Sequence, residues 1–114
     1  MQEFDKINQE ILTFVKDRDW EKFHSPKNLS MALTVEASEL LEIFQWQKEN
    51  DFLDSKINDV IIQDKKDEVA DIFYYLLRIC QKMDINLEEA FWDKMEKNKI
   101  KYPIDQFKGK STKY

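Results

Sequence analysis

The sequence predicts an all-α protein, and three features point to that fold class. Its 114 residues include one glycine and two prolines, so few positions can form the tight turns that join β-strands. Apolar residues recur at three- and four-residue steps, which is the period of an amphipathic helix. With 42% hydrophobic and 13% aromatic residues the chain can bury one core, so we expect a single domain over residues 1–114.

The first two helices are expected at residues 4–16 and 26–46. The apolar stripe of the first helix consists of Phe4, Ile7, Ile11 and Phe14. The stretch RDWEKFHSPKN then interrupts the periodicity, and Ser25 followed by Pro26 is typical of an N-cap with proline at the first helical position. The stripe of the second helix consists of Leu29, Ala32, Leu33, Leu40, Ile43 and Phe44.

Two further helices are expected, at about residues 60–82 and 87–99. The third helix carries Ile72, Leu76, Ile79 and Met83 at helical spacing. Asn86 followed by Glu89 fits a capping box, which predicts that the fourth helix begins at Leu87. The polar residues 47–59 are expected to form a loop or a short helix. Residues 103–114, which contain a proline and the only glycine, are expected to form an extended or mobile tail.

Composition argues against several classes of partner. The net charge of −5 without a basic block argues against binding to DNA or RNA, because such binding depends on neutralising phosphates. The one cysteine, Cys80, cannot form an internal disulfide, and the stretch MQEFDKINQE lacks the basic and apolar regions of a signal peptide. No apolar run approaches the roughly 20 residues that span a bilayer. We therefore expect a soluble, cytoplasmic protein with no membrane partner.

Two pairs of acidic residues share the apolar sides of consecutive helices. Glu36 and Glu39, in the stretch LTVEASELLEIF, each lie four residues before an apolar residue of the second stripe. Glu68 and Asp71, in the stretch DEVADIFYYLLRI, each lie four residues before an apolar or aromatic residue of the third helix. Two helices therefore each direct an i, i+3 acid pair toward the expected core.

Inward-facing acids of this kind favour a cation site. Four carboxylates in a partly dry cleft repel one another and lose hydration, so they either take up protons or bind cations. Because only oxygen ligands are offered, and no histidine lies three residues after any of the acids, the set suits Mg²⁺ or Mn²⁺ rather than Zn²⁺ or a di-iron centre. The alternative is that the acids lie at the edge of the stripe and pair with Lys65 or Lys66, as most helical charges do.

The acids and the stretches around them resemble a known family. Glu36-x-x-Glu39, a 28-residue spacer and Glu68-x-x-Asp71 match the signature of the all-α nucleoside triphosphate pyrophosphohydrolases of the MazG type, most closely the dCTP pyrophosphatase branch. Five stretches of the chain also resemble this family; in order they are RDWEKFHSPKNL, EASELLEIFQW, DEVADIFYYL, KMEKNKIKYP and FKGKSTKY. The resemblance implies a four-helix MazG-like bundle that forms a dimer or a dimer of dimers. It also implies a Mg²⁺-dependent enzyme that splits a nucleoside triphosphate into monophosphate and pyrophosphate.

The resemblance assigns the acids two roles. Glu36, Glu39, Glu68 and Asp71 are expected to hold the metal ions, with Mg²⁺ as the cofactor and Mn²⁺ as a substitute. Either Glu36 or Glu39 is also expected to be catalytic, by orienting or deprotonating the attacking water. The implied substrate is dCTP or a modified dCTP, and the implied role is house-cleaning of the nucleotide pool.

The resemblance also implies residues that contact the base. Trp20 and Trp46 match tryptophans that wall the base pocket, where an indole face stacks on a nucleobase; their alternative is an ordinary place in the core. His24, the only histidine, and Asn28 are candidates for a contact to base or phosphate. The alternative for His24 is a loop or satisfied core position.

Phosphate binding is implied for one face of the fourth helix. Lys94, Asn98 and Tyr102 lie four residues apart and match positions that hold phosphates in the family. Their alternative is the solvated end of a helix.

Two other functions remain open at this point. One is a nucleoside triphosphate diphosphatase of broader specificity. The other is a non-catalytic helical dimer used for protein interaction, in which the acids are merely solvated. The completeness of the acid set argues against the second alternative.

Overall fold

The computed structural model of the protein describes residues 2–46 and 55–110, except for the side chains of residues 55–64. The elements in chain order are α1 (Gln2–Asp17), the 3-10 helix η1 (Glu21–Phe23), α2 (Pro26–Phe44), α3 (Ser55–Met83), α4 (Leu87–Lys101) and α5 (Ile104–Phe107). Within those described ranges no β-strand occurs, so the all-α class is confirmed. None of the described helices combines the length and hydropathy of a membrane-spanning segment.

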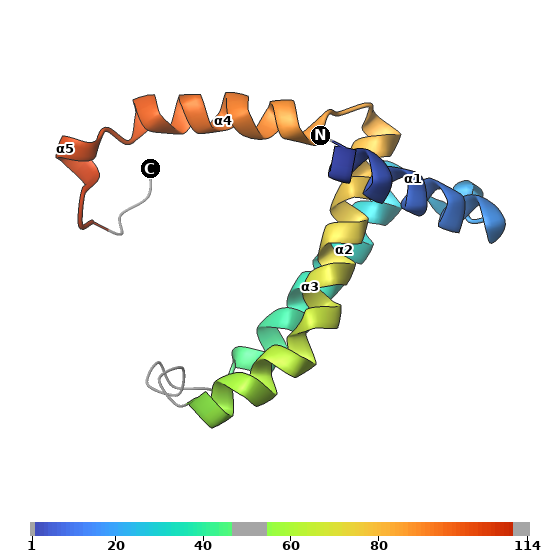
Figure 1. Ribbon diagram of the computed structural model, residues 1–114, viewed down its shortest axis with the longest axis horizontal. Coiled ribbons are helices and arrows are strands. Elements are labelled where there is room, and N and C mark those ends of the chain that lie inside the picture. The colour runs from blue at the N-terminus through green and yellow to red at the C-terminus, as the bar shows by residue number, and fades with distance from the viewer. Residues whose placement is uncertain (1, 47–54, 111–114) are drawn as a thin grey trace. The chain divides into compact units, whose positions relative to one another are not determined.

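The chain forms two compact units, Met1–Met83 and Asp84–Tyr114. In the first unit, α2 and α3 run alongside one another in opposite directions, and α1 packs on α3 (Figure 1). This helical hairpin is what brings Glu36 and Glu39 of α2 close to Glu68 of α3. The second unit contains α4 and α5.

The third helix begins earlier than expected. It starts at Ser55 rather than near residue 60, so residues 55–59 are helical where we expected a loop or short helix. The sequence did not predict this first turn because its residues are mostly polar, and helical periodicity can be recognised only from the spacing of apolar residues. The remainder of the expected loop, residues 47–54, lies outside the described residues.

The ends of α1 and α2 follow local rules. At the end of α1 the backbone N–H of Trp20 donates to the carbonyl of Val15 (3.1 Å), and the backbone N–H of Asp19 donates to the carbonyl of Lys16 (3.1 Å). These two hydrogen bonds define a Schellman motif. Asp19 takes the required left-handed conformation, with φ of 55°. The Ser25 side chain accepts from the backbone N–H of Asn28 (3.0 Å), which confirms the expected N-cap of α2.

A small core holds the first unit together. Its buried apolar residues are Ile11 and Val15 of α1, Leu29 of α2, and Leu77 and Cys80 of α3. Cys80 is a free thiol within this core, and burial raises its pKa. The thiol is therefore a packing group in its protonated form.

The second unit begins with the expected cap and ends differently from expectation. Asn86 accepts from the backbone N–H of Glu89 (3.1 Å), so the predicted start of α4 at Leu87 is confirmed. Where we expected an extended tail, residues 104–107 form the short helix α5. The ring of Phe107 packs edge-on against Tyr102 with centroids 5.1 Å apart, a contact that no local propensity rule anticipates. Residues 111–114 lie outside the described residues.

Candidate active site

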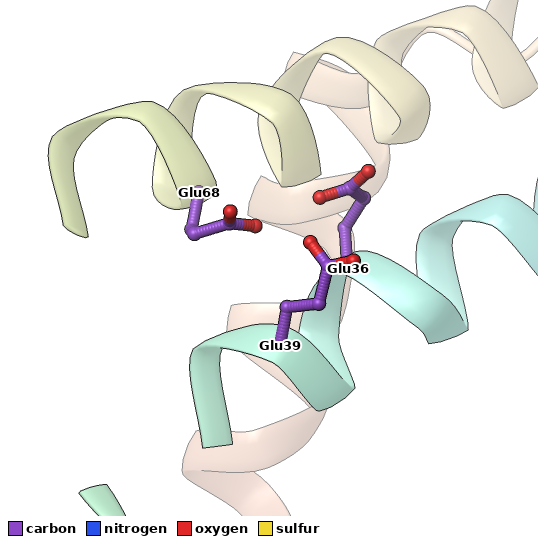
Figure 2. Close-up of side chains that lie close together, drawn as sticks. All are labelled: Glu36, Glu39 and Glu68. Carbon is purple, nitrogen blue, oxygen red and sulfur yellow. The ribbon is translucent and has the colours of Figure 1, made fainter. Parts of the chain in front are cut away.

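Three carboxylates meet between α2 and α3. Glu36 and Glu39 project from successive turns of α2, and Glu68 projects toward them from α3 (Figure 2). Each contributes one oxygen to a group whose members lie within 4.8 Å of one another. All three side chains are half-buried. The inward direction that the sequence predicted for these acids is therefore present in the structure.

The proximity of these acids changes their affinity for protons. The hydrogen bond with Glu68 raises the pKa of Glu36 to about 7, and burial and the neighbouring Glu39 act in the same direction. For Glu68 the hydrogen bond with Glu36 lowers the pKa, but burial and the charges of Glu39 and Asp71 outweigh it, so the pKa is raised. Without a cation, the cluster therefore holds protons that exposed carboxyls would have released.

The cluster has the properties of a hard-cation site. The Oε2 atoms of Glu36 and Glu68 are buried without a hydrogen-bond partner among the described residues, which is costly for oxygens that can carry charge. A divalent cation would satisfy both atoms and offset the mutual repulsion, and an all-oxygen donor set suits Mg²⁺ or Mn²⁺. A neighbouring lysine would lower the pKa of Glu36, but every cause of its shift is burial or another acid. For Glu36 this pattern does not fit the alternative in which the acid is neutralised by Lys65 or Lys66.

A cavity of about 440 Å³ adjoins the cluster in the first unit. It is lined by Glu10, Ile11, Phe14, Trp20, Glu36, Ala70, Asp71, Tyr74 and Tyr75. Asp71 is exposed and lies outside the group of three close carboxylates, but it shares the cavity wall with Glu36. The cavity therefore has acidic lining residues, which are these two and Glu10, as well as an aromatic side.

The aromatic side of the cavity is a continuous set of edge-on ring contacts. Phe14 packs against Trp20 with centroids 5.5 Å apart and against Tyr74 at 6.0 Å, and Tyr74 packs against Tyr75 at 4.9 Å. The Schellman motif after α1 places Trp20 on this wall. Flat apolar walls of this kind suit a planar ring such as a nucleobase.

His24 lies half-buried, between η1 and α2, and does not line the cavity. Its Nδ1 accepts a hydrogen bond from Nε of Arg78 on α3, at 3.0 Å. Burial and then the positive charge of Arg78 lower the pKa of His24; Lys82 acts in the same direction and Glu21 opposes them. The imidazole is consequently neutral at pH 7.

Two other expected base contacts do not line the cavity. The Nδ2 of Asn28 donates to the carbonyl of Phe23 (3.2 Å), so its side chain closes the turn that precedes α2. Trp46 lies just after α2 and is 87% exposed. The roles expected for these residues stay predictions.

The expected phosphate contacts belong to the second unit. Lys94 is exposed, whereas Asn98 and Tyr102 are half-buried. The backbone N–H of Tyr102 donates to the carbonyl of Asn98 (2.8 Å) and ends α4 there. Tyr102 is the C-cap of α4, so the helical face expected to carry Lys94, Asn98 and Tyr102 ends at that residue. Their role in phosphate binding stays a prediction.

The sequence analysis missed residues that the structure places at the site. These are Glu10, Ile11, Phe14, Ala70, Tyr74 and Tyr75 on the cavity wall, and Arg78, which bonds His24. One signal was available for Arg78, because it follows Asp71 by seven residues and so places a cation on the inward side of α3. The assignment of Phe14 required knowing that α1 packs across α3, which periodicity does not reveal.

Comparisons with known proteins agree with the fold. The model of the MazG-like family matches residues 31–114. The chain is 34% identical over 106 residues to dCTP pyrophosphatase 1 of Rattus norvegicus and 33% identical over 101 residues to the Homo sapiens protein of that name. Each alignment covers 89% of this chain and 59% of the relative, so the chain spans less than two thirds of these curated relatives.

A solved structure extends the likeness to three dimensions. The crystal structure of a pyrophosphatase from Archaeoglobus fulgidus is 38% identical in sequence and superposes with a TM-score of 0.82, over 89% of this chain and 93% of that one. The all-helical fold and the paired acids thus define a protein of the MazG class. This chain belongs to the MazG-like family, and the resemblance seen in its sequence is confirmed.

Proposed function

We propose that this protein hydrolyses a nucleoside triphosphate to the monophosphate and pyrophosphate in a Mg²⁺-dependent reaction, with Mn²⁺ as a possible substitute. The observation that carries this proposal is the meeting of three carboxylates from α2 and α3 next to an aromatic cavity. The relatives named dCTP pyrophosphatase 1 support dCTP or a modified dCTP as the substrate. The corresponding cellular role is removal of unwanted nucleotides from the cytoplasmic pool.

The acids supply the reactive end of the proposed site. Glu36, Glu39, Glu68 and Asp71 would hold the metal ions, which offset phosphate charge and lower the pKa of a bound water. Glu36 or Glu39 orients or deprotonates the water that attacks the α-phosphorus. Because the acids lie on two adjacent helices, they are held in place before the substrate arrives, and less order has to be created on binding.

The remaining residues supply binding. Stacking of a nucleobase on an aromatic face contributes about 1–3 kcal/mol, and Trp20 is the tryptophan that lines the cavity. Trp46, His24 and Asn28 are proposed as further contacts to the base or the phosphates. Lys94, Asn98 and Tyr102 are proposed to bind the phosphates, on the strength of the family resemblance.

The test is a panel of nucleotides with identification of the products. We expect the purified full chain with Mg²⁺ to convert dCTP or a modified dCTP to the monophosphate and pyrophosphate, as measured by ³¹P NMR. EDTA should abolish turnover, and excess Mg²⁺ should restore it. Similar rates with all ribo- and deoxynucleotides would favour the diphosphatase of broad specificity. Stepwise release of orthophosphate would contradict the proposed reaction.

A matched pair of variants links the reaction to the cluster. Glu68→Gln should abolish turnover, because it removes one charge from the cation site, while the protein remains folded. Asp67→Asn makes the same change one residue away, at an exposed position of α3, and should retain full activity. Equal activity in the two variants would mean that the cluster takes no part in catalysis. That result would favour the alternative in which the protein is a non-catalytic helical dimer used for protein interaction.

A further inference from the structure

A buried arginine joins α3 to the segment between α1 and α2. Arg78 is 2% exposed, although its side chain carries a permanent charge. Its Nη1 donates to Oε1 of Gln81 at 3.0 Å, and its Nη2 donates to the carboxylate of Glu21. Its Nε donates to His24, as described above. All three nitrogens of the guanidinium therefore have described acceptors; of these, Glu21 begins η1 and His24 directly follows it.

The bond to His24 decides where the imidazole carries its proton. An arginine Nε–H can only donate, so Nδ1 of His24 must be unprotonated. A neutral histidine whose Nδ1 is unprotonated carries its hydrogen on Nε2. His24 can therefore offer only a hydrogen-bond donor from its other nitrogen.

The same arginine anchors the segment that carries Trp20. Trp20 is the residue before η1, and its carbonyl accepts from the backbone N–H of Phe23 at 2.9 Å. The carbonyl of Glu21 accepts from the backbone N–H of His24 at 3.1 Å. One short turn thus links Trp20 to Glu21 and His24, two of the three residues that Arg78 bonds. Arg78 itself does not line the cavity, so any effect on a ligand must pass through the residues that it bonds, and Trp20 is the lining residue that this turn links to them.

We infer that Arg78 is a positioning residue of the ligand cavity, which holds His24 in the Nε2-protonated tautomer and keeps Trp20 on the cavity wall. The helix that carries Glu68 and Asp71 thereby also sets the position of Trp20 on the cavity wall. This inference rests on the proposed function only for the identity of the ligand. The tautomer and the position of Trp20 can be measured without any turnover.

The first measurement uses the wild-type protein. His24 is the only histidine, so long-range ¹H–¹⁵N correlation spectra of the full chain contain the imidazole signals of one residue. At pH 7.5 we expect Nδ1 to have the shift of an unprotonated nitrogen and Nε2 that of a protonated one. A proton on Nδ1, or a fully protonated ring, would overturn the inference.

The second measurement compares three variants. Arg78→Met removes every donor, and Arg78→Lys keeps the charge without the planar fork that reaches both acceptors. In both, we expect a mixture of His24 tautomers and a shifted indole N–H signal of Trp20. For the preferred nucleotide, KM should rise about tenfold, as for the loss of one well-placed hydrogen bond, with kcat within about twofold.

The third variant, Lys82→Met, is the control. Lys82 also bonds Glu21 from α3 but does not bond His24, so this variant should retain the wild-type tautomer, indole signal and KM. Unchanged spectra in a folded Arg78 variant would overturn the inference, as would altered spectra with wild-type KM. If the wild-type protein turns over no nucleotide, the proposed function fails, and the spectra alone decide the role of Arg78. Should Arg78→Met not fold, Arg78→Lys and the wild-type spectrum still decide it.

Discussion

Glu36 carries a carboxyl group whose protonation is coupled to folding. Its neighbours raise its pKa from the ordinary value of 4.5 to about 7, so the folded chain binds this proton more tightly than the unfolded chain does. The resulting contribution to stability is complete below about pH 4.5 and is lost as the pH rises through 7. In the absence of metal, repulsion within the cluster should therefore be greatest at alkaline pH.

Glu36→Gln tests this repulsion, because it keeps the shape of the side chain and removes its charge. In EDTA, we expect the Tm of the variant to exceed that of the wild type by a few degrees at pH 8 and to match it at pH 5. Mg²⁺ should stabilise the wild type much more than the variant. Differential scanning calorimetry measures both effects, with Asp67→Asn as the exposed control. A lower Tm for Glu36→Gln at pH 8 would mean that the acid is structural.

The tryptophans allow a second test with single residues. If stacking supplies about 1–3 kcal/mol, Trp20→Ala should raise KM roughly 5- to 150-fold and flatten the differences among deoxynucleotides. The requirement for Mg²⁺ should not change. Trp46→Ala is expected to act in the same direction, although that indole is 87% exposed in the single chain. Trp92→Ala, on α4, is the control. Wild-type kinetics in both Trp20→Ala and Trp46→Ala would mean that neither tryptophan binds the base.

Among the helical elements, the end of α1 contains a strained residue. Asp19 holds a positive φ that glycine adopts without steric cost. Asp19→Gly relieves about 1–2 kcal/mol of left-handed strain, but the greater backbone freedom of glycine costs about 0.5–1 kcal/mol. We therefore expect a small rise in the free energy of unfolding, reduced further by loss of the exposed ion pair with Lys22. Urea denaturation measures the change. Gln9→Gly, at an exposed helical position of α1, should instead lower the free energy of unfolding by about 1 kcal/mol.

Sequence reasoning succeeded where a local rule determines an element. Ser25 and Asn86 begin α2 and α4 as predicted, because N-caps depend on one side chain and the next three residues. Glu36, Glu39 and Glu68 were predicted to face inward, because helical spacing alone places them on the apolar side, whereas Asp71, predicted with them, is exposed. The first turn of α3 and the helix α5 were missed, since the first has a polar sequence and the second packs Phe107 on Tyr102. The contact between Arg78 and His24 spans 54 residues, and no local pattern predicts it.

At the scale of the whole molecule, the exposed apolar surface is large for the small described core. Exposed positions on α2 and α3 include Met31, Val35, Leu41, Val69 and Phe73. Such surface favours association, and we expect light scattering at micromolar concentration to report a dimer or a tetramer. A monomer would contradict the expectation and the shared site that the family resemblance implies.

Two charge substitutions test which surface associates. Val35→Lys and Val69→Lys place a cation on exposed apolar positions of α2 and α3, and should shift the protein toward smaller species. Gln9→Lys makes a comparable change on the polar surface of α1 and should leave the mass unchanged. If both valine variants retain the mass of the wild-type oligomer, the interface lies on other helices.

The rate at which a thiol reagent modifies Cys80 can measure the opening of the first unit. Cys80 is the only cysteine and is 7% exposed in α3, so a thiol reagent can react with it only after that helix has opened. When reclosing is faster than the reaction, the rate of modification reports the fraction of time that the first unit spends open. A cation held by Glu68 on the same helix should slow modification by a factor of one plus the ratio of free cation to its dissociation constant. Cation affinity can thus be read from a single sulfur atom, whether or not any nucleotide is present.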